Sequence, residues 1–379
     1  MTTTEVPRPD LAEISAPSRV ADEGEGVGLD EVGLAARNHG MPLELLRHDV
    51  TPVGAHYLLT HYDIPAADAA TWQLAVGGLV ERPLSLSLAD LRSRPEVTRT
   101  VTLECAGNGR ARLSPRPVSQ PWLHEAVGTM TWTGTPLAGV LADAGVLDGA
   151  VDVVFTGADH GVEKGTEQDF QRSLSVGDAT DPDVLLVWAC NGIDLPPQHG
   201  YPLRLLVPGW YGMASVKWLR SVEVVDERFD GYQMRAYSLR QRPDEVGERL
   251  TRIAPRALVL PPGFPDYLSR RRIMAAGDQV LEGRAWSGWG EVSSVEVTLD
   301  GGASWQQAEL GPQPDPRAWV RWSMPWRAIE GRYVVGARAT DATGRSQAPG
   351  QPWNRGGFAN PAPQELDVLV RPADERNQA

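Results

Sequence analysis

One of the two cysteines in this 379-residue chain, Cys105, lies in the segment TLECAGNGR, where a glycine-rich turn follows it and Arg110 closes the turn. Glycines let a backbone approach a bulky ligand closely, and a nearby arginine lowers the pKa of a thiol. A thiolate at this place could bind a metal or attack an electrophile. An isolated cysteine is more commonly a small buried hydrophobic residue, so the motif by itself leaves both interpretations open.

Basic and hydrogen-bonding residues gather at three further places: RNH at 37–39, HGYPLR at 199–204 and SVKWL at 215–219. A thiolate nucleophile needs a base, and the cysteine motif itself holds no histidine. Such clusters, together with a lone cysteine, favour a large anionic cofactor that is held at several points. A metal cofactor that carries a phosphate group satisfies both requirements.

The composition limits the partners and the compartment. A net charge of -13 and a pI near 5.1 oppose long-range attraction to nucleic acid or to an anionic membrane, so we expect neither as a partner. Cys105 and Cys190 are too few for a disulfide framework or a four-cysteine zinc site, and we interpret Cys190 as a core residue. No export signal and no apolar run of roughly 18–20 residues is visible, which predicts a cytoplasmic protein.

Sequence patterns divide the chain into five parts. Residues 1–30 lack periodicity and predict a flexible N-terminal arm. Residues 31–250 alternate apolar runs with turns, and PLSLSLADLRSRPEV and TPLAGVLADAG indicate short capped helices, which predicts an α+β domain. The proline-rich stretch 251–272 indicates a linker. Residues 273–372 alternate in polarity around an Asp-Gly-Gly hairpin signal, which predicts an all-β immunoglobulin-like sandwich, and 373–379 form a tail.

From about Arg37 to the C-terminus the chain resembles the sulfite oxidase family of molybdenum enzymes. ECAGNGR is similar to the family's cysteine motif, RNHG to its first motif, and HGYPLRLLVPGWYGMASVKWL to the segment that clasps the cofactor. AWSGWGEVSSVEVTLDGGASW is similar to the start of the family's immunoglobulin-like dimerisation domain. The resemblance implies a sulfite-oxidase-type molybdopterin-binding domain, followed by the sandwich, in a homodimer.

The resemblance also implies the residues that bind the cofactor. The thiolate of Cys105 would bind molybdenum, which a pyranopterin (molybdopterin) carries. Arg204 and Lys217 can neutralise the phosphate, while His199 and Asp159 can bond pterin heteroatoms. The implied cofactor-binding set is Arg37, Asn38, His39, Cys105, Asp159, His199, Arg204, Ser215, Val216 and Lys217.

A pocket for an anionic substrate is implied in the same way. In the family, two arginines flank the oxo face of the metal, a tyrosine points at it and a tryptophan lines the wall. Animal and plant members bring in another arginine from the far domain in a W-N-x-R-G context, whereas WNRGG places Arg355 one residue early. Gly109 stands where animal members carry a second basic residue, and both departures bear on the substrate more than on the cofactor. The implied catalytic set is Arg37, Arg110, Trp122, Tyr237 and Arg355.

The implied reaction is molybdenum-dependent oxidation of sulfite to sulfate by oxygen-atom transfer. The chain holds no CxxCH motif and no stretch that resembles cytochrome b5, so we expect no haem and a separate electron acceptor, namely a cytochrome, another carrier or dioxygen. The first alternative is a molybdenum-dependent reductase of a sulfoxide or other oxyanion, which the shifted Arg355 and the pair Trp210–Tyr211 keep open. The second is a cofactor-free binding module that associates through the sandwich.

Overall fold

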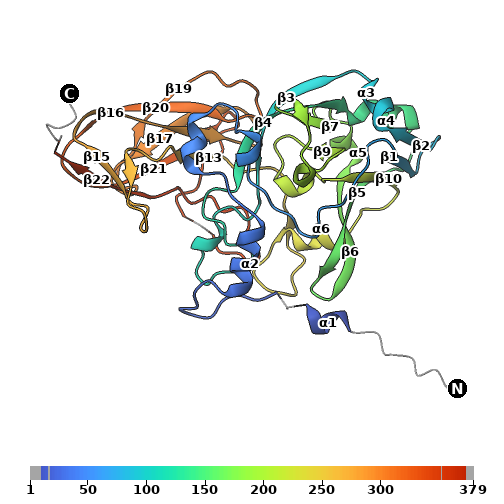
Figure 1. The fold of residues 1–379 in the computed structure, drawn as a ribbon, viewed down its shortest axis with the longest axis horizontal. Coiled ribbons are helices and arrows are strands. Elements are labelled where there is room, and N and C mark those ends of the chain that lie inside the picture. Colours follow the sequence, from blue (N-terminus) through green and yellow to red (C-terminus); the bar gives the residue numbers. More distant parts are fainter. Residues whose placement is uncertain (1–9, 16–17, 351, 373–379) are drawn as a thin grey trace.

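The computed structural model describes residues 10–15, 18–350 and 352–372, which form an α+β lobe and an all-β lobe side by side (Figure 1). The predicted tail at 373–379 lies outside the described residues. All helices in the described part are short: α1 Leu11–Ile14, α2 Leu29–Arg37, α3 Leu88–Arg92, α4 Leu137–Ala144, α5 Val176–Ala179, α6 Tyr232–Ala236, and the 3-10 helices η1 Leu43–Arg47, η2 Val53–Ala55, η3 Arg110–Arg112, η4 Pro197–His199 and η5 Gly212–Ala214.

Two sheets form the α+β lobe. The first has the order β2-β1-β10-β5-β6, in which β1 and β10 are parallel and the other neighbours antiparallel. In the second, β3, β4, β7 and β8 follow one another and β9 also pairs with β7. Their bounds are β1 Gln73–Gly78, β2 Leu84–Ser87, β3 Val97–Glu104, β4 Val127–Pro136, β5 Asp152–Glu163, β6 Thr166–Ser175, β7 Leu185–Cys190, β8 Ile193–Asp194, β9 Arg204–Leu206 and β10 Leu219–Val225, with β11 Ser238–Leu239 and β12 Glu248–Arg249 as a separate pair.

Capping residues define the two helices that the sequence predicts. Ser87 accepts a hydrogen bond from the Asp90 backbone and so begins α3 with a capping box. Helix α4 buries an apolar face and ends at Gly145, whose φ of 70° suits glycine at this position. Both helices pack into one large hydrophobic core that supports the first lobe.

The all-β lobe is a sandwich of two sheets, as predicted. One sheet has the order β13-β16-β20-β19 and the other β14-β15-β22-β21-β17-β18. Trp322 is fully buried among the residues between them, and Gly301 and Gly302 adopt the positive φ angles that the hairpin after β17 requires. The bounds are β13 Arg256–Val259, β14 Phe264–Pro265, β15 Arg272–Ala275, β16 Gly277–Trp286, β17 Val292–Thr298, β18 Gln306–Gln307, β19 Glu309–Leu310, β20 Val320–Ala328, β21 Gly331–Asp341 and β22 Leu366–Arg371.

The structure corrects the linker that the prolines suggest at 251–272. Strand β13 pairs with β16 from Arg256↔Trp286 to Val259↔Gly283, and β14 pairs with β15. The sandwich therefore begins near residue 256. Prolines stand before and after β13 and at the end of β14, where a strand tolerates them, so proline content misplaced the boundary.

The described part of the predicted arm, residues 10–15 and 18–30, is docked on the first lobe. Val20 forms a β-bridge with Pro117, and the side chain of Arg116 donates to Gly26 O at 2.7 Å. Sequence composition could not reveal these partners because they lie about a hundred residues away in the chain. Among the residues that the structure describes, no helix is both long and apolar enough to cross a membrane.

Candidate active site

Cys105 follows directly on β3, at the point where the buried half of that strand ends. Its backbone N–H donates to Ala126 O at 2.9 Å, and its carbonyl accepts from the Asn108 N–H at 3.0 Å. Gly109 takes a φ of 93°, and a Cβ there would come within 2.9 Å of Asn360, so glycine is required to turn the loop. The loop thus fixes the thiol in a wall between two cavities.

Burial outweighs the neighbouring arginine at the thiol. The Cys105 side chain is buried, and desolvation raises its pKa, although the charge of Arg110 acts in the opposite direction. The expectation that Arg110 makes the free thiol unusually acidic is therefore wrong for the protein alone. A bound cation would favour the thiolate, because a coordinating thiol is deprotonated.

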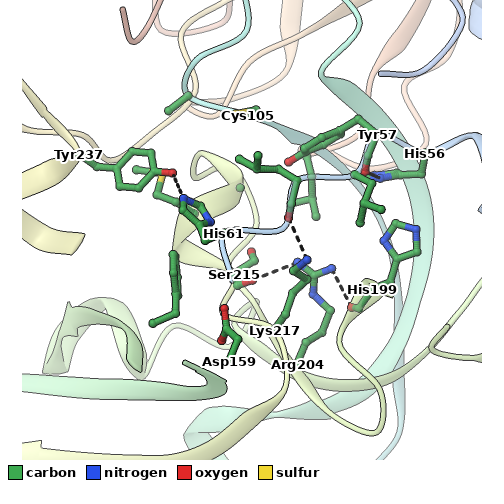
Figure 2. A pocket seen from close by; sticks show the side chains of 17 residues that line it. His56, Tyr57, His61, Cys105, Asp159, His199, Arg204, Ser215, Lys217 and Tyr237 are labelled. Carbon is green, nitrogen blue, oxygen red and sulfur yellow. Dashed lines mark hydrogen bonds between the residues drawn. The ribbon is translucent and has the colours of Figure 1, made fainter. Parts of the chain in front are cut away.

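The inner cavity has a volume of about 70 Å³ and lies beneath Cys105. Figure 2 shows side chains from distant segments that converge on it, from the loop before β1, from β5, and from the region between η4 and β10. Its polar lining consists of His56, Tyr57, His61, Cys105, Asp159, His199, Arg204, Ser215, Lys217 and Tyr237.

Arg204 is a buried cation whose partners are backbone carbonyls. Its guanidinium donates to Ser215 O at 3.0 Å and to His199 O at 3.2 Å, and it lies 4.9 Å from the centroid of the Trp132 ring. Burial lowers the pKa of Arg204 to about 10, which still leaves it charged at neutral pH. A charge that is buried with dipoles only, and with no carboxylate, favours an anionic ligand beside it.

Lys217 is held in the same manner and lies close to Arg204 (Figure 2). Its ammonium donates to Leu59 O at 2.9 Å and to Gln198 O at 3.1 Å, and burial lowers its pKa to about 7. Burial raises the pKa of Asp159 to about 6. Within the described part of the chain, Oδ1 of Asp159 is buried without a hydrogen-bond partner. An unsatisfied buried carboxylate oxygen indicates a missing donor in the cavity.

Three histidines of the inner cavity are neutral at physiological pH. Burial is the main cause that lowers the pKa of His56 and of His61 to about 4 and that of His199 to about 2. The rings of His56 and His199 meet edge to face, with centroids 5.6 Å apart. Neutral imidazoles can donate and accept hydrogen bonds without adding charge, which suits contacts to an uncharged heterocycle.

An outer cavity of about 420 Å³ lies on the other side of Cys105 and Tyr237, which line both spaces together with His61 and Leu59. Helix α2, the tip of the β5–β6 hairpin and the segment after β21 contribute to its walls. Its cations include Arg110, Lys164, Arg240 and Arg355. The structure therefore brings Arg355, from the far lobe, into the same cavity as Cys105.

Arg110 and Tyr237 are positioned by aromatic contacts. Arg110 donates to Ser119 Oγ at 2.9 Å and to Gly357 O at 3.3 Å, and its guanidinium carbon lies 5.0 Å from the centroid of Phe358. The Tyr237 ring is 5.0 Å from the same phenylalanine, and its hydroxyl shares a hydrogen bond of 2.8 Å with Nε2 of His61. Phe358 thus fixes one cation and one phenol at the boundary between the cavities.

A buried polar network supports the cysteine loop from behind. The carboxylate of Glu104 accepts from Arg256 at 2.7 Å, from Trp286 Nε1 at 2.8 Å and from Asn108 Nδ2 at 3.0 Å. Arg256 also bonds to His124 Nδ1 at 2.9 Å. Because Arg256 and Trp286 belong to β13 and β16, the sandwich holds the residue that precedes the thiol.

Not every predicted site residue reaches a cavity. Arg37 is 44% exposed at its side chain and donates to Tyr62 O, so it lines neither cavity. His39 is exposed and contributes a backbone bridge to Leu58. Asn38 lines the outer cavity and accepts from the Thr60 N–H at 2.8 Å. Val216 and Trp122 are buried beside the site rather than in its lining.

The structure adds residues that the sequence alone does not single out. His61, in the segment LTHYDIP, lines both cavities, whereas the resemblance implies the RNH segment at 37–39. The fold brings Lys164 and Arg240 into the same cavity as Arg110, although they are far apart in the sequence. Lys164 lies at the tip of the β5–β6 hairpin, and Arg240 follows the short strand β11. In a single sequence, nothing distinguishes a charged turn residue that lines a cavity from one that faces solvent.

Comparison with known proteins agrees with this geometry. Residues 61–233 match the family described as oxidoreductase molybdopterin binding domain, and residues 265–362 match the Mo-co oxidoreductase dimerisation domain. Sulfite oxidase of Gallus gallus is 39% identical over 300 residues, which cover 75% of this chain and 64% of that protein. An NADH nitrate reductase of Brassica napus is 31% identical over 355 residues, which cover 85% of this chain and 39% of that protein.

A solved structure extends the likeness to the whole fold. The sulfane dehydrogenase SoxCD from Paracoccus pantotrophus superposes with a TM-score of 0.74 at 25% identity, over 98% of this chain and 94% of that chain. The chain spans less than two thirds of the length of the two curated relatives named above. The likeness therefore concerns the cofactor-binding lobe and the sandwich together.

The fold and the site define a molybdopterin-dependent oxidoreductase. The residues present fit that cofactor, because the inner cavity offers a thiol, two buried cations that bond only to carbonyls, and the unsatisfied Oδ1 of Asp159. The chain belongs to the sulfite oxidase family of molybdenum-cofactor oxidoreductases. Its cofactor is molybdenum carried by molybdopterin.

Proposed function

We propose that this protein oxidises sulfite to sulfate and passes the two electrons singly to an external acceptor. The observation that carries the proposal is the place of Cys105, in the common wall of a buried inner cavity and a cation-lined outer cavity. The buried cations and hydrogen-bonding groups of the inner cavity suit the anionic part of a cofactor that stays bound, and the cations of the outer cavity suit a small anion that must come and go. The 39% identity to a sulfite oxidase supports the choice of anion.

The residues of the inner cavity hold the cofactor in this proposal. Cys105 binds the metal, Arg204 and Lys217 neutralise the phosphate, and Asp159 and His199 bond the pterin, with Ser215 beside them. When bound, the cofactor supplies the oxygen atom and takes up the two electrons. The protein supplies orientation and charge, as in cofactor enzymes generally.

The residues of the outer cavity hold the anion. Arg110 is close enough to the thiol for the charge of each group to affect the pKa of the other. Arg355 and Arg110 present guanidinium groups that match an oxyanion in shape and charge. Tyr237 turns its hydroxyl toward His61 at the boundary between the cavities, where the proton of that hydrogen bond is shared. Arg37, His39, Val216 and Trp122 remain predicted contributors without a cavity position.

The opposite direction of reaction is a second candidate. Nitrate reductases match as much as 85% of this chain, and a reductase would use the same cofactor and the same cations for an oxyanion such as nitrate. We also propose a homodimer that associates through the sandwich, which matches the dimerisation domain, and a separate electron acceptor. A cytoplasmic location remains a prediction from the sequence.

The test is sulfite-dependent reduction of ferricyanide by purified protein of known molybdenum content. Each sulfite that becomes sulfate releases two electrons, so two ferricyanide ions should be consumed per sulfite. Cys105→Ser should lose molybdenum and turnover together. Cys190→Ser is the matched control, because that cysteine is buried in the same hydrophobic cluster but lines neither cavity.

Three outcomes separate the candidates. Turnover with sulfite in the wild type and in Cys190→Ser, but not in Cys105→Ser, supports the oxidase. Molybdenum near one per chain with no sulfite turnover, but with oxidation of a reduced dye by nitrate or a sulfoxide, overturns it in favour of the reductase. Molybdenum retained at the wild-type level in Cys105→Ser would contradict the role of the thiol.

A further inference from the structure

The outer cavity is much larger than the anion that the proposed reaction needs. A water molecule occupies about 30 Å³ in the liquid, so the four heavy atoms of sulfite need on the order of 100 Å³. The outer cavity measures about 420 Å³. Sulfite bound at Arg110 would therefore leave most of the cavity open.

Among the described residues, the open part contains two cations without counter-ions, Arg240 and Arg355, although the carboxylates of Asp30, Glu31 and Glu163 line the same cavity. In the described part of the chain, the guanidinium groups of Arg240 and Arg355 make no hydrogen bond or ion pair, although the protein is acidic overall. Lys164 contacts one carboxylate, Glu163, at 3.9 Å. Unpaired cations that converge on a half-buried space attract an anion, because each lacks a competing internal partner.

Lys164 is held in place by its backbone. It occupies the tip of the β5–β6 hairpin with a φ of 52°, and its ammonium lies 5.9 Å from the centroid of the Tyr232 ring. The charges of Arg240, Arg110 and Arg355 each help to lower its pKa, after burial, which shows that the four cations share one field. The four side chains therefore converge on one cavity although they come from separate segments of the chain.

We propose that Lys164 and Arg240 form a second anion subsite in the outer cavity, with Arg355 between it and the Arg110 pocket. Its ligand is a small oxyanion dianion, which is sulfite on the way in or sulfate on the way out. The substrate identity rests on the proposed function, whereas the subsite itself rests on the cation cluster. Two dianions can occupy the cavity together, because it has the volume for both and several cations in its lining.

The test is calorimetric titration of the molybdenum-loaded protein with inorganic sulfate at low ionic strength, where exposed charges are least screened. The wild type should bind two sulfate ions per chain. The double variant Lys164→Gln, Arg240→Gln should bind one. Arg235→Gln removes one positive charge from a nearby exposed position outside both cavities, and should still bind two, whereas the single variant Arg240→Gln, which removes one charge inside the cavity, should weaken the second site.

Kinetics provide the second measurement. Loss of two charge-assisted contacts at the subsite should raise the KM for sulfite roughly tenfold and leave kcat within about twofold. An unchanged sulfate stoichiometry in the double variant would overturn the subsite, and so would a loss of kcat at constant KM. If the wild type binds two sulfate ions but does not oxidise sulfite, the subsite stands and the proposed function fails. If the wild type oxidises sulfite but binds only one sulfate ion, the proposed function stands and the subsite fails.

Discussion

The inner and outer cavities share a wall at Cys105 but hold their cations differently. Arg204 and Lys217 of the inner cavity are buried and donate to five backbone carbonyls in all. Arg240 and Arg355 of the outer cavity make no such bonds within the described structure. Fixed cations suit a ligand that is bound once and retained, since they need no rearrangement, while unpaired cations suit a ligand that must leave.

The difference also has a cost in stability. A buried charge with no counter-ion destabilises the folded chain until an anion arrives, and the lowered pKa of Lys217 reflects this cost. Lys164, Arg240 and Arg355 of the outer cavity remain partly exposed to water and cost less. The inner cavity therefore needs support from the surrounding structure, which the network of Glu104 and Arg256 provides from the sandwich.

The largest effect is expected from breaking that network. Arg256→Met leaves the carboxylate of Glu104 buried and without its cation, and removal of one partner of a buried ion pair costs about 3–5 kcal/mol. We expect the free energy of unfolding to fall by this amount in urea denaturation. Molybdenum retention should also fall, since Cys105 follows Glu104 directly.

Arg355→Met is the matched change in the outer cavity. It removes the same charge where no internal partner is left unpaired, so we expect a change below about 1 kcal/mol. If Arg256→Met and Arg355→Met lowered the free energy of unfolding equally, this would contradict the distinction between a cation with an internal partner and one without. The double variant Glu104→Gln, Arg256→Met should recover part of the loss if the unpaired carboxylate is its cause.

A smaller effect is expected from pH in the cofactor-free protein. Lys217 has a pKa of about 7 when folded and near 10.5 when unfolded, so between these values the unfolded state binds more protons. Stability should therefore rise with pH over this window, by up to roughly 4 kcal/mol. Lys217→Met should lack this rise when unfolding is measured at pH 7 and pH 10, while Arg240→Met should retain it.

Cofactor loading sharpens the same measurement. An anionic group beside Lys217 stabilises its charged form and raises its pKa, so the rise in stability above pH 7 should flatten in the loaded protein. Asp159, whose pKa is raised to about 6, acts with the opposite sign at lower pH, because its protonated form is favoured in the folded state. Its contribution is lost as pH rises through 6. A loaded protein with an unchanged slope above pH 7 would argue against a phosphate near Lys217.

Local signals predict most of the fold and the inner cavity. The capped helices α3 and α4, the Asp-Gly-Gly hairpin and the alternating strands of the sandwich each depend on neighbouring residues, so the sequence contains their cause. Cys105, Asp159, His199, Arg204, Ser215 and Lys217 do meet in one cavity, as the resemblance implied.

Features that depend on distant contacts were missed or misplaced. The arm appears featureless in the sequence because its partners Pro117 and Arg116 lie far along the chain. The prediction of a linker is wrong because β13 pairs with β16, and the proline content of the segment does not reveal this pairing. The resemblance implies RNH at 37–39 as a cofactor-binding motif, whereas the histidine that lines both cavities is His61, in a less distinctive segment. A single sequence cannot show which of two histidine segments faces a given cavity.

A small effect is also expected at the boundary between the cavities. Tyr237→Phe keeps the ring that packs at 5.0 Å against Phe358 but removes the hydrogen bond to His61. One buried hydrogen bond contributes about 1 kcal/mol, so the free energy of unfolding should fall by about that amount while molybdenum content stays unchanged. His61→Gln, which can still bond the phenol, should lose less. If Tyr237→Phe instead releases molybdenum, the phenol belongs to the inner cavity and the boundary between fixed and exchangeable ligands lies on the outer side of this ring.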